Sequence, residues 1–573
     1  MDYHRSFSFY FMVTFLVLSN GILLSQWSTD PWINTAINAD DYMQAYPDAC
    51  TDMRGGVIVV WREKNTDLYA LRLDKYGYMK WNPDGVPICT AEQWQWTIDI
   101  VSDEKGGAII LWKDYRQLNQ EWDLEYASNT LYVQRIDSQG RVLWEKNGVQ
   151  LSDFRTYTYI DASDSLQQIQ RIPTHSEKIA PDGHGGAYIC WTATHDSIDD
   201  QTFNQIAYIQ HVDCSGNCLW DEYGKPVMVG IQEICSIISD DSSGIYCLID
   251  WKYIYRFNYN GNMMWDNPIS TLLGIDADMV TDDMGGFFAA GTRKYYPGKI
   301  LMYRADRSGN KLLDNWTYDI ETGIETISPR MRIYPDGHNG IYLIFKDYDD
   351  VIHMLRVGPD GNIIWEKHGK DIDTPNLIDG YGNWFRLYGK NDSTYRVYAR
   401  KYDKDGNSLW GDDGILVRIR NEDWGGFGFW KFVSDLNGGL IMVWDETRHL
   451  TQYWDIMGQM VNSDGQLGIA INTINPKIPP PIIFNLVKCY PNPFNLSTNI
   501  IYQIAEPGYV NISIFDINGK TVFEDKFYQN QPGTHEYIWF GQNVNNCSLS
   551  SGIYFVRLLN NAESHSEKML LLK

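Results

Sequence analysis

The sequence predicts an all-β protein, with an eight-bladed β-propeller followed by a small Ig-like β-sandwich. A short pattern of turns returns eight times between Asp52 and Gly468. The apolar runs between these turns are short and rich in β-branched and aromatic residues, with no helical period. A proline-rich segment after Ile474 separates the repeats from a second region of alternating strands. We therefore expect a signal peptide at 1–25, repeats at 40–473, a linker at 474–483 and a β-sandwich at 484–573.

The first element of each repeat is a hairpin turn that contains Gly-Gly or a single Gly. Glycine tolerates the positive φ that tight hairpin turns require. The turns lie at Gly55-Gly56, Gly106-Gly107, Gly185-Gly186, Gly244, Gly285-Gly286, Gly340, Gly382 and Gly438-Gly439.

The second element is a turn of the form Asp-x-x-Gly, followed four residues later by Trp. The Asp side chain can bond its own backbone, and the Gly accepts positive φ. The tryptophans at this position are Trp81, Trp144, Trp220, Trp265, Trp365 and Trp410, and Leu313 replaces Trp in one copy. We expect these large rings to pack between neighbouring repeats, because aromatic side chains bury the most apolar area.

Each repeat has room for about four short strands. In the first repeat these are Val57–Trp61, Leu68–Leu73, Tyr78–Trp81 with its continuation, and Thr97–Val101. Four antiparallel strands repeated about every 55 residues are typical of a propeller blade. Eight copies predict eight blades, or seven if the degenerate copies at Gly382 and Gly465 do not form blades. A strand before Asp52 can complete the last blade and close the ring.

Three insertions lengthen the repeats, at residues 117–128, 152–177 and 195–203. Binding residues lie more often on loops than on the strands that support them. The insertions are therefore candidates for a ligand-binding surface.

The composition excludes two classes of partner. The chain is 44% hydrophobic, which is enough for a packed core, and its formal charge is −25. Nucleic-acid phosphates and anionic lipids both require a basic surface. We therefore expect no nucleic-acid partner.

The N-terminus is typical of a secretory signal peptide. His4 and Arg5 precede an apolar run from Phe7 to Leu24. No other stretch approaches the roughly 20 apolar residues that cross a bilayer, so we expect no membrane span in the mature chain.

Nine cysteines agree with an oxidising destination, and their odd number leaves at least one unpaired. Candidate disulfides are Cys235 with Cys247 across a hairpin, Cys214 with Cys218 around a turn, and Cys489 with Cys547 in the C-terminal region. The spacing lacks the paired thiolates and histidine of a zinc module.

Apolar and polar residues alternate in the C-terminal region, as they do in the strands of a β-sandwich. Its expected strands are Ile500–Ile504, Val510–Phe515, Thr521–Phe527, His535–Trp539 and Ile553–Leu559, separated by turn signals at Asn518-Gly519 and Pro532-Gly533.

Several motifs in this region resemble the type A C-terminal sorting domain of the bacterial type IX secretion system. They comprise Tyr490, Pro491, Asn492, Pro493 and Phe494, then Gly519, then Gly552 and Tyr554, and the final Lys573. The resemblance covers residues 484–573. It implies Sec export, passage across the outer membrane by that secretion machinery, removal of this domain, and a secreted or cell-surface location. An ordinary Ig-like adhesion domain is the alternative.

Motif searches give no catalytic assignment. The sequence contains no Gly-x-Ser-x-Gly elbow, His-Glu-x-x-His helix or phosphate loop. The Asp-x-x-Gly-x-x-x-Trp pattern partly resembles the tryptophan-docking repeats of quinoprotein dehydrogenases, but Tyr76, Gln139 and Ser215 stand where those repeats carry Thr. A hydrolase or quinoprotein-like enzyme that uses the propeller channel is the alternative function. We expect no cofactor, although the acidic run 195–200 offers oxygen ligands for calcium.

Aromatic residues beyond those needed between blades are the candidate binding residues. They are Trp94, Trp96, Trp122, Trp424 and Trp430. Exposed aromatic rings stack on sugars and dominate protein interfaces. The sequence thus predicts a secreted binding module for a glycan or protein ligand.

Overall fold

The computed structural model describes most of the chain between Trp27 and Leu572. The residues outside this description are 1–26, 33, 39–41, 65, 117–128, 153–155, 161–165, 171–174, 197–202, 231–232, 241–243, 272, 293–298, 314–315, 320–327, 347–350, 371, 392–393, 421–426, 448–453, 469–484, 491, 496, 505–507, 530–532, 546, 561–562 and 573. The predicted signal peptide and linker therefore lie outside the described residues. Every regular element among the described residues is a strand, which confirms the all-β prediction.

The described strands before residue 469 form eight four-stranded antiparallel sheets. In strand order the first four are β2 (Gln44–Thr51), β3 (Val57–Glu63), β4 (Asp67–Leu73) and β5 (Val86–Cys89); β6 (Gln95–Ser102), β7 (Ala108–Asp114), β8 (Thr130–Ile136) and β9 (Val149–Gln150); β12 (His175–Pro181), β13 (Ala187–Asp196), β14 (Phe203–Val212) and β15 (Lys225–Val229); β16 (Ile234–Ser239), β17 (Ile245–Ile249), β18 (Tyr253–Phe257) and β19 (Ile269–Ser270).

The other four sheets continue the same order along the chain. They are β20 (Ile275–Thr281), β21 (Phe287–Thr292), β22 (Lys299–Ala305) and β23 (Trp316–Asp319); β24 (Ser328–Pro335), β25 (Ile341–Lys346), β26 (Ile352–Val357) and β27 (Ile363–Gly369); β28 (Leu377–Ile378), β29 (Trp384–Asn391), β30 (Tyr395–Tyr402) and β31 (Ile415–Arg420); β32 (Phe427–Ser434), β33 (Leu440–Thr447), β34 (Trp454–Val461) and β1 (Thr35–Asn38). The insertion after β9 adds a hairpin of β10 (Thr156–Ile160) and β11 (Leu166–Gln170).

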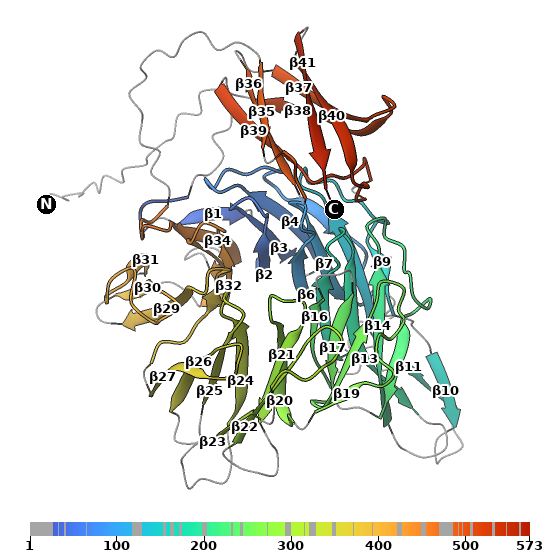
Figure 1. Ribbon diagram of the computed structural model, residues 1–573, viewed down its shortest axis with the longest axis vertical. Coiled ribbons are helices and arrows are strands. Elements are labelled where there is room, and N and C mark those ends of the chain that lie inside the picture. The colour runs from blue at the N-terminus through green and yellow to red at the C-terminus, as the bar shows by residue number, and fades with distance from the viewer. Residues whose placement is uncertain are drawn as a thin grey trace, which may run out of the picture.

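Successive sheets are neighbours in a propeller-like arrangement (Figure 1). The first strand of a sheet contacts the first strand of the next, as in the pairs β2 with β6, β6 with β12, β12 with β16, β16 with β20, β20 with β24, and β28 with β32. The last sheet also contacts the first, through β32 and β2. The N-terminal strand β1 pairs with β34 and gives the last sheet its fourth strand.

Two details of the sequence prediction were wrong. The strand Thr97–Val101 lies in β6, the first strand of the second sheet, and the fourth strand of the first sheet is β5. The strand immediately before Asp52 is β2, which begins the first sheet, so the closing strand is the earlier β1. The reason is that each glycine turn joins strands one and two, so a sheet begins one strand before its turn.

A buried ion pair recurs at the glycine turns. The turn carboxylate accepts the backbone N–H of the turn glycine, as Asp103 Oδ1 does from Gly107 at 2.7 Å. Its second oxygen binds an arginine, or in one sheet a histidine, on the third strand at 2.6–2.9 Å. The pairs are Asp52–Arg72, Asp103–Arg135, Asp182–His211, Asp240–Arg256, Asp282–Arg304 and Asp336–Arg356.

The same cation also connects neighbouring sheets. Arg135 Nη1 donates to the carbonyl of Cys214 in the next sheet at 3.2 Å, and Trp144 Nε1 donates to the same carbonyl at 3.1 Å. The Trp144 ring lies against Gly216, where an added Cβ would approach the ring to 2.7 Å. The predicted packing of these tryptophans between repeats is therefore confirmed, and the turn glycine is required because the ring occupies the space of a side chain.

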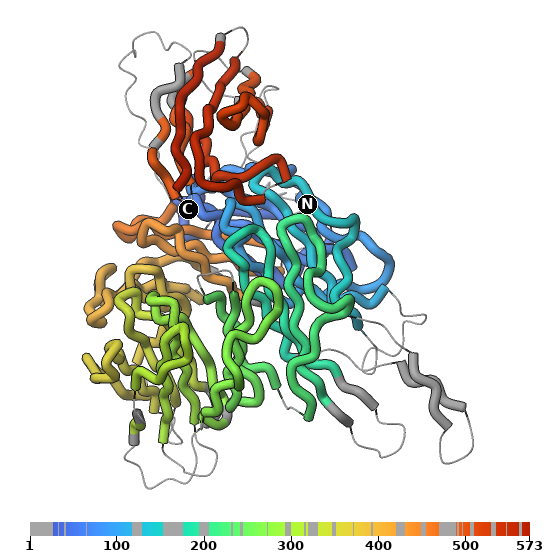
Figure 2. Tube along the Cα trace, turned by 45° about the vertical axis from the view of Figure 1, so that its right-hand side comes forward, coloured from blue at the N-terminus to red at the C-terminus, as the bar shows by residue number. Residues whose placement is uncertain are grey.

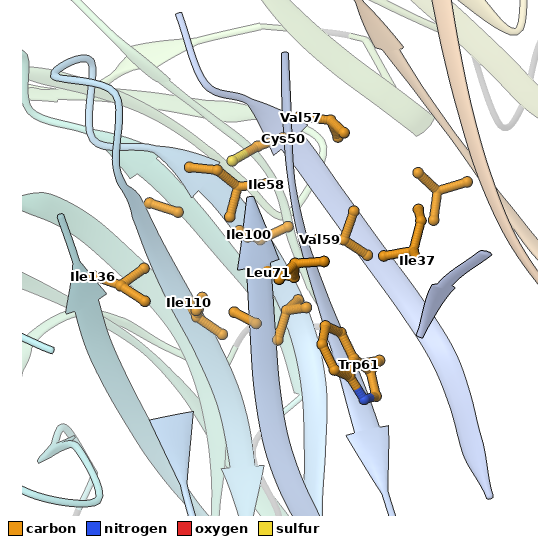
Figure 3. Packing of buried hydrophobic residues seen from close by; sticks show 14 of the residues in the cluster. Ile37, Cys50, Val57, Ile58, Val59, Trp61, Leu71, Ile100, Ile110 and Ile136 are labelled. Carbon is orange, nitrogen blue, oxygen red and sulfur yellow. The ribbon is translucent and has the colours of Figure 1, made fainter. Parts of the chain in front are cut away.

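The hydrophobic core continues from sheet to sheet. Val57, Val59 and Trp61 of β3 are fully buried, and the same cluster includes Ile100 of β6 and Ile110 of β7 (Figure 3). Strands buried on both faces explain why the runs at 57–61 and 108–112 are continuously apolar.

The C-terminal region forms two sheets around a separate core. One sheet has the order β35 (Asn485–Tyr490), β36 (Thr498–Ile504) and β39 (Gly533–Trp539). The other has the order β38 (Thr521–Gln529), β37 (Gly508–Asp516), β40 (Gly552–Asn560) and β41 (Glu563–Leu571). Phe494, Ile512 and Trp539 belong to the buried cluster between them.

This domain lies at the end of the ring that carries the glycine turns (Figures 1 and 2). Arg54 of the first turn lies 5.6 Å from the centre of the Phe540 ring. Lys105 Nζ of the next turn lies 3.4 Å from Ser548 Oγ. A disulfide joins Cys214 of the ring to Cys547 of the domain, with the Cα atoms 5.9 Å apart.

The observed disulfide contradicts the suggested pairings Cys214–Cys218 and Cys489–Cys547, and Cys235 and Cys247 are both free thiols. In the register of β16 with β17, Ile237 rather than Cys235 lies opposite Cys247. Cys489 is buried on β35, whereas Cys547 lies in a turn at the domain's edge that faces the ring. Cys218 remains a free thiol. Local spacing could not identify a bond between residues separated by 333 positions.

Replacing Asp103 by asparagine tests the buried ion pairs. In Asp103→Asn the amide oxygen of the new side chain still accepts the turn N–H groups, but Arg135, fully buried, loses its counter-charge. We expect a loss of about 3 kcal/mol in unfolding free energy, measured by denaturant titration. Asp306→Asn is the matched control, because Asp306 makes the same turn bonds but pairs with neutral Asn310. Equal losses of unfolding free energy in both variants would contradict a stabilising role for the buried Asp103–Arg135 ion pair.

The disulfide predicts how the chain separates after cleavage between residues 470 and 483. With a protease site inserted there and cut, the two fragments should migrate together on a denaturing gel without reductant and apart with it. The two fragments of the cut Cys547→Ser variant should migrate apart both with and without reductant. Separation of the cut wild-type protein without reductant would contradict the disulfide.

Candidate functional site

The candidate binding residues that the structure describes lie at the end of the ring opposite the C-terminal domain. The glycine turns follow the first strand of each sheet, so residues at the start of β2, β6 and β32 and at the end of β3 lie at the other end. Tyr46, Arg62, Trp94, Trp96 and Trp430 all lie there.

Arg62 brings together two of the predicted tryptophans. Its guanidinium carbon lies 4.4 Å from the centre of the Tyr46 ring, 5.6 Å from Trp94 and 4.6 Å from Trp96. Tyr46 and Trp96 also contact each other, with ring centres 5.1 Å apart. These four residues, from β2, β3 and the segment leading into β6, are called the Arg62 cluster below.

The Arg62 guanidinium is buried, and its hydrogen bonds are incomplete. Arg62 is 5% exposed, and its Nε and Nη1 atoms have no hydrogen-bond partner among the described residues. Burial lowers the pKa of Arg62, and the neighbouring Tyr46 hydroxyl partly offsets this effect. The Nε–H and Nη1–H groups thus have no acceptor among the described residues, although the rings stabilise the charge from their faces.

The position in the next sheet that corresponds to Arg62 carries a cation with an acidic partner. Lys113 follows Asp103 by ten residues, as Arg62 follows Asp52. Lys113 Nζ forms an ion pair with Glu177 Oε1 of the following sheet at 2.9 Å. Around Arg62 the following sheet instead supplies Trp94 and Trp96.

Trp430 lies in a separate pocket of about 280 Å³ between β29, β30 and β32. Its lining is mostly apolar and aromatic, and its polar members include Asn376, whose Oδ1 accepts the Leu387 N–H at 2.7 Å. The remaining lining residues are Leu387, Tyr388, Gly389, Tyr395, Val397, Trp430 and Phe432. Trp430 stacks on buried Trp444 with ring centres 4.4 Å apart.

Charged residues come after the aromatic residues in β2, β6 and β32, the first strands of their sheets. Lys431 Nζ lies 2.8 Å from Asp48 Oδ1 and joins β32 to β2. Burial raises the pKa of Asp99 on β6 to about 6, and the charge of Asp48 adds to the rise, whereas the Ile100 N–H, Lys431 and Lys178 oppose it. Burial also raises the pKa of Asp48 despite Lys431.

The structure thus brings Trp94 and Trp96 together and places Trp430 elsewhere on the same end of the ring. Trp122 and Trp424 lie outside the described residues. Sequence reasoning missed Tyr46 and Arg62. The signal for Arg62 was a cation directly after the buried run Val57–Trp61, but nothing in the sequence shows that it lacks the acid that its counterpart Lys113 has.

The calcium prediction at 195–200 stays a prediction, because Asp199 and Asp200 lie outside the described residues. In the part of the chain that the structure covers, no three His, Cys, Asp or Glu side chains are grouped to hold a metal ion. The same part contains no helix long and apolar enough to span a membrane.

The sorting motif holds the last strand in place. Asn492 Nδ2 donates to the Lys568 carbonyl at 2.7 Å, and Asn492 Oδ1 accepts the Leu570 N–H at 2.9 Å. Phe494 is 2% exposed and packs on Trp539, and its backbone bonds Leu570 and Leu572. Gly519 has φ of +77° in the turn after β37, and Tyr554 on β40 donates to the Ser550 carbonyl.

The other motif positions are described in part or lie outside the description. Tyr490 ends β35, and the Asn492–Pro493 peptide is cis. Gly552 begins β40. Pro491 and Lys573 lie outside the described residues.

Comparison with known proteins identifies the C-terminal region. Residues 488–572 match the family model described as the secretion system C-terminal sorting domain. No curated protein matches the chain.

Three solved structures illustrate the similarity of the whole chain. The first is a puromycin hydrolase, 12% identical over 65% of this chain, with a TM-score of 0.33; this chain spans 52% of that protein. PorZ, a surface component of the type IX secretion system of Porphyromonas gingivalis, is 8% identical over 91% of this chain and 79% of its own, with a TM-score of 0.25. The BP39L lectin of Burkholderia pseudomallei is 11% identical over 75% of this chain and 100% of its own, with a TM-score of 0.33. No residue role is transferred from them.

The matched domain settles the destination of the protein. Residues 488–572 are a type IX secretion C-terminal sorting domain, which directs secretion to the cell surface or the extracellular space. The secretion machinery is therefore a partner of the chain.

The pKa of Asp99 predicts a pH-dependent difference in stability. Because the folded-state pKa of about 6 lies above the ordinary value of 3.8, ionisation opposes folding, and this group lowers stability as pH rises from about 4 to about 6. Asp99→Asn should therefore be more stable than wild type by about 1–2 kcal/mol at pH 7, allowing for the partial exposure of Asp99. The gain should shrink towards pH 4, as measured by denaturant titration at each pH. A gain independent of pH would contradict this interpretation.

Proposed function

We propose that this protein is a secreted or surface-displayed binding module, in which a closed eight-bladed β-propeller carries the ligand site and the C-terminal domain serves export. The ligand is a glycan or a protein. The signal peptide comprises residues 1–25, the propeller residues 40–473 together with the preceding strand β1 (Thr35–Asn38) that closes it, the linker residues 474–483 and the Ig-like sorting sandwich residues 484–573.

Three features support a closed eight-bladed ring. Eight four-stranded sheets follow one another, each with the same pair of turns. Contacts between first strands continue from the last sheet back to the first. The pairing of β1 with β34 joins the two ends of the repeat region, as closure requires.

The observation that carries the binding proposal is the Arg62 cluster. Three aromatic rings surround one cation whose Nε and Nη1 atoms have no acceptor in the described chain. Trp96 is 42% exposed, so part of the cluster is open to solvent. Aromatic rings with a few polar groups are typical of sites that grip sugars or protein side chains.

The position of the sorting domain supports the same conclusion. Its contacts involve the glycine-turn end of the ring, through Arg54, Lys105 and Cys214. The end with the Arg62 cluster and the Trp430 pocket is the opposite one. A ligand can therefore reach the candidate residues while the sorting domain is attached.

Binding by the aromatic end can be tested with the full chain on an array of glycans and a panel of extracellular matrix proteins. We expect wild type to retain at least one ligand class, and Trp96→Ala to weaken retention about tenfold or more, because losing a stacking ring costs about 1–3 kcal/mol. Tyr381→Ala is the control, since this ring is 62% exposed but lies at the glycine-turn end.

Two results would count against the proposal. One is a wild-type protein that binds no glycan and no protein on either panel. The other is an equal loss of binding in Trp96→Ala and Tyr381→Ala with unchanged melting temperatures. That result would show that binding does not depend specifically on the aromatic end.

A further inference from the structure

We propose that the Arg62 cluster binds the carboxylate of an acidic sugar residue, with the sugar ring stacked on the surrounding aromatic side chains. This inference rests on the proposed binding function and specifies its ligand. It assigns the ligand's anionic group to Arg62 and the ligand's ring to Tyr46, Trp94 and Trp96.

The first argument is the missing counter-charge. A buried guanidinium without an anion costs several kcal/mol, and a folded chain normally compensates for it. Arg72, Arg135, Arg256, Arg304 and Arg356 are all buried, and each has an aspartate at 2.6–2.9 Å. Arg62 is equally buried, but no carboxylate among the described residues pairs with it. The chain has 73 acidic residues, so the lack of an acid here is not a matter of composition.

The second argument is the comparison with Lys113. The equivalent cation of the next sheet is neutralised by Glu177, which a neighbouring strand supplies. At Arg62 the neighbouring strand contributes aromatic rings in place of the acid. The cluster therefore has the geometry of an ion-pair position to which the described residues contribute no anion.

The third argument concerns the class of anion. The Nε–H and Nη1–H groups of a guanidinium point to different sides, so a carboxylate accepts a charge-assisted hydrogen bond from one of them and neutralises the delocalised charge. Aromatic faces complement the C–H face of a sugar ring, and Trp96 is the most exposed of the three rings. A carboxylated sugar presents both features in one residue, whereas an acidic peptide side chain brings the carboxylate without a ring.

The charge of the whole protein limits how such a ligand is recognised. At −25 the chain repels polyanions at long range, so attraction has to arise from short-range contact with Arg62. Trp96 covers the guanidinium from one side and is the ring with the largest exposed fraction. Rotation of the Trp96 side chain would therefore give the carboxylate access to Nε or to Nη1.

The test measures binding of the full chain to carboxylated oligosaccharides and to the same compounds as methyl esters. The probes are oligogalacturonate, a hyaluronan oligosaccharide and sialyllactose, because they place the carboxylate on different sugars. Esterification keeps the ring and removes the charge. We expect wild type to prefer at least one free acid over its ester by about tenfold or more, since hydrogen bonds to charged groups contribute about 1.5–3 kcal/mol.

Variants assign the preference to the cluster. Arg62→Gln should abolish the difference between acid and ester, and Arg62→Lys should leave a reduced difference, because a lysine keeps the charge but lacks the planar guanidinium donors. Trp96→Ala should weaken binding of acid and ester alike. Arg141→Gln is the control, since Arg141 is an exposed arginine at the glycine-turn end. Thermal melting of each variant verifies folding, and Arg62→Lys keeps the test valid if Arg62→Gln does not fold.

The outcomes separate this inference from the function on which it rests. Equal binding of acid and ester, with binding still dependent on Trp96, overturns the carboxylate assignment and leaves the binding module in place. An Arg62-dependent preference for a polyglutamate peptide over all three sugars overturns the glycan class. No binding to any of these probes, with Trp96-dependent binding to another ligand, overturns the inference alone.

Discussion

The ring depends on one repeated interaction: a turn carboxylate that holds a buried cation, which in turn holds the next sheet. Asp103 fixes its own turn through backbone N–H groups and pairs with Arg135, and Arg135 donates to the Cys214 carbonyl of the following sheet. Trp144 donates to the same carbonyl and packs its ring on the adjacent turn glycine. Because Arg135 and Trp144 of one sheet both donate hydrogen bonds to the Cys214 carbonyl of the next, the turn geometry of one sheet sets the position of its neighbour.

This interaction also divides the ring into two ends with different tasks. At the glycine-turn end, side chains are committed to ion pairs, and the sorting domain is attached through Cys214 and Cys547. At the other end the pattern breaks: Arg62 has rings where Lys113 has Glu177, and Trp430 lines a pocket. A fold whose stability is secured at one end can leave incompletely paired groups at the other, which is where recognition is expected.

Local chemistry explains which features could be predicted from the sequence. The turn aspartates and glycines act within a few residues of themselves, so their spacing predicted the eight turns, the strands and the absence of helices. The tryptophans at the second turn were assigned correctly to packing between sheets, because a ring four residues after a turn glycine recurs in most of the repeats. The disulfide and the placement of Thr97–Val101 were wrong, since both depend on which strands become neighbours.

The sequence by itself determined the all-β class, the repeat, the sorting motif and the aromatic residues worth examining. Only the tertiary structure decided that Trp94 and Trp96 surround Arg62, that Trp430 lies in a different pocket, and that β1 rather than β2 joins the last sheet. The physical reason is the distance along the chain over which each interaction acts. Turn formation and strand alternation are short-range properties, whereas the missing counter-charge of Arg62 exists only once three separate strands have brought their side chains together.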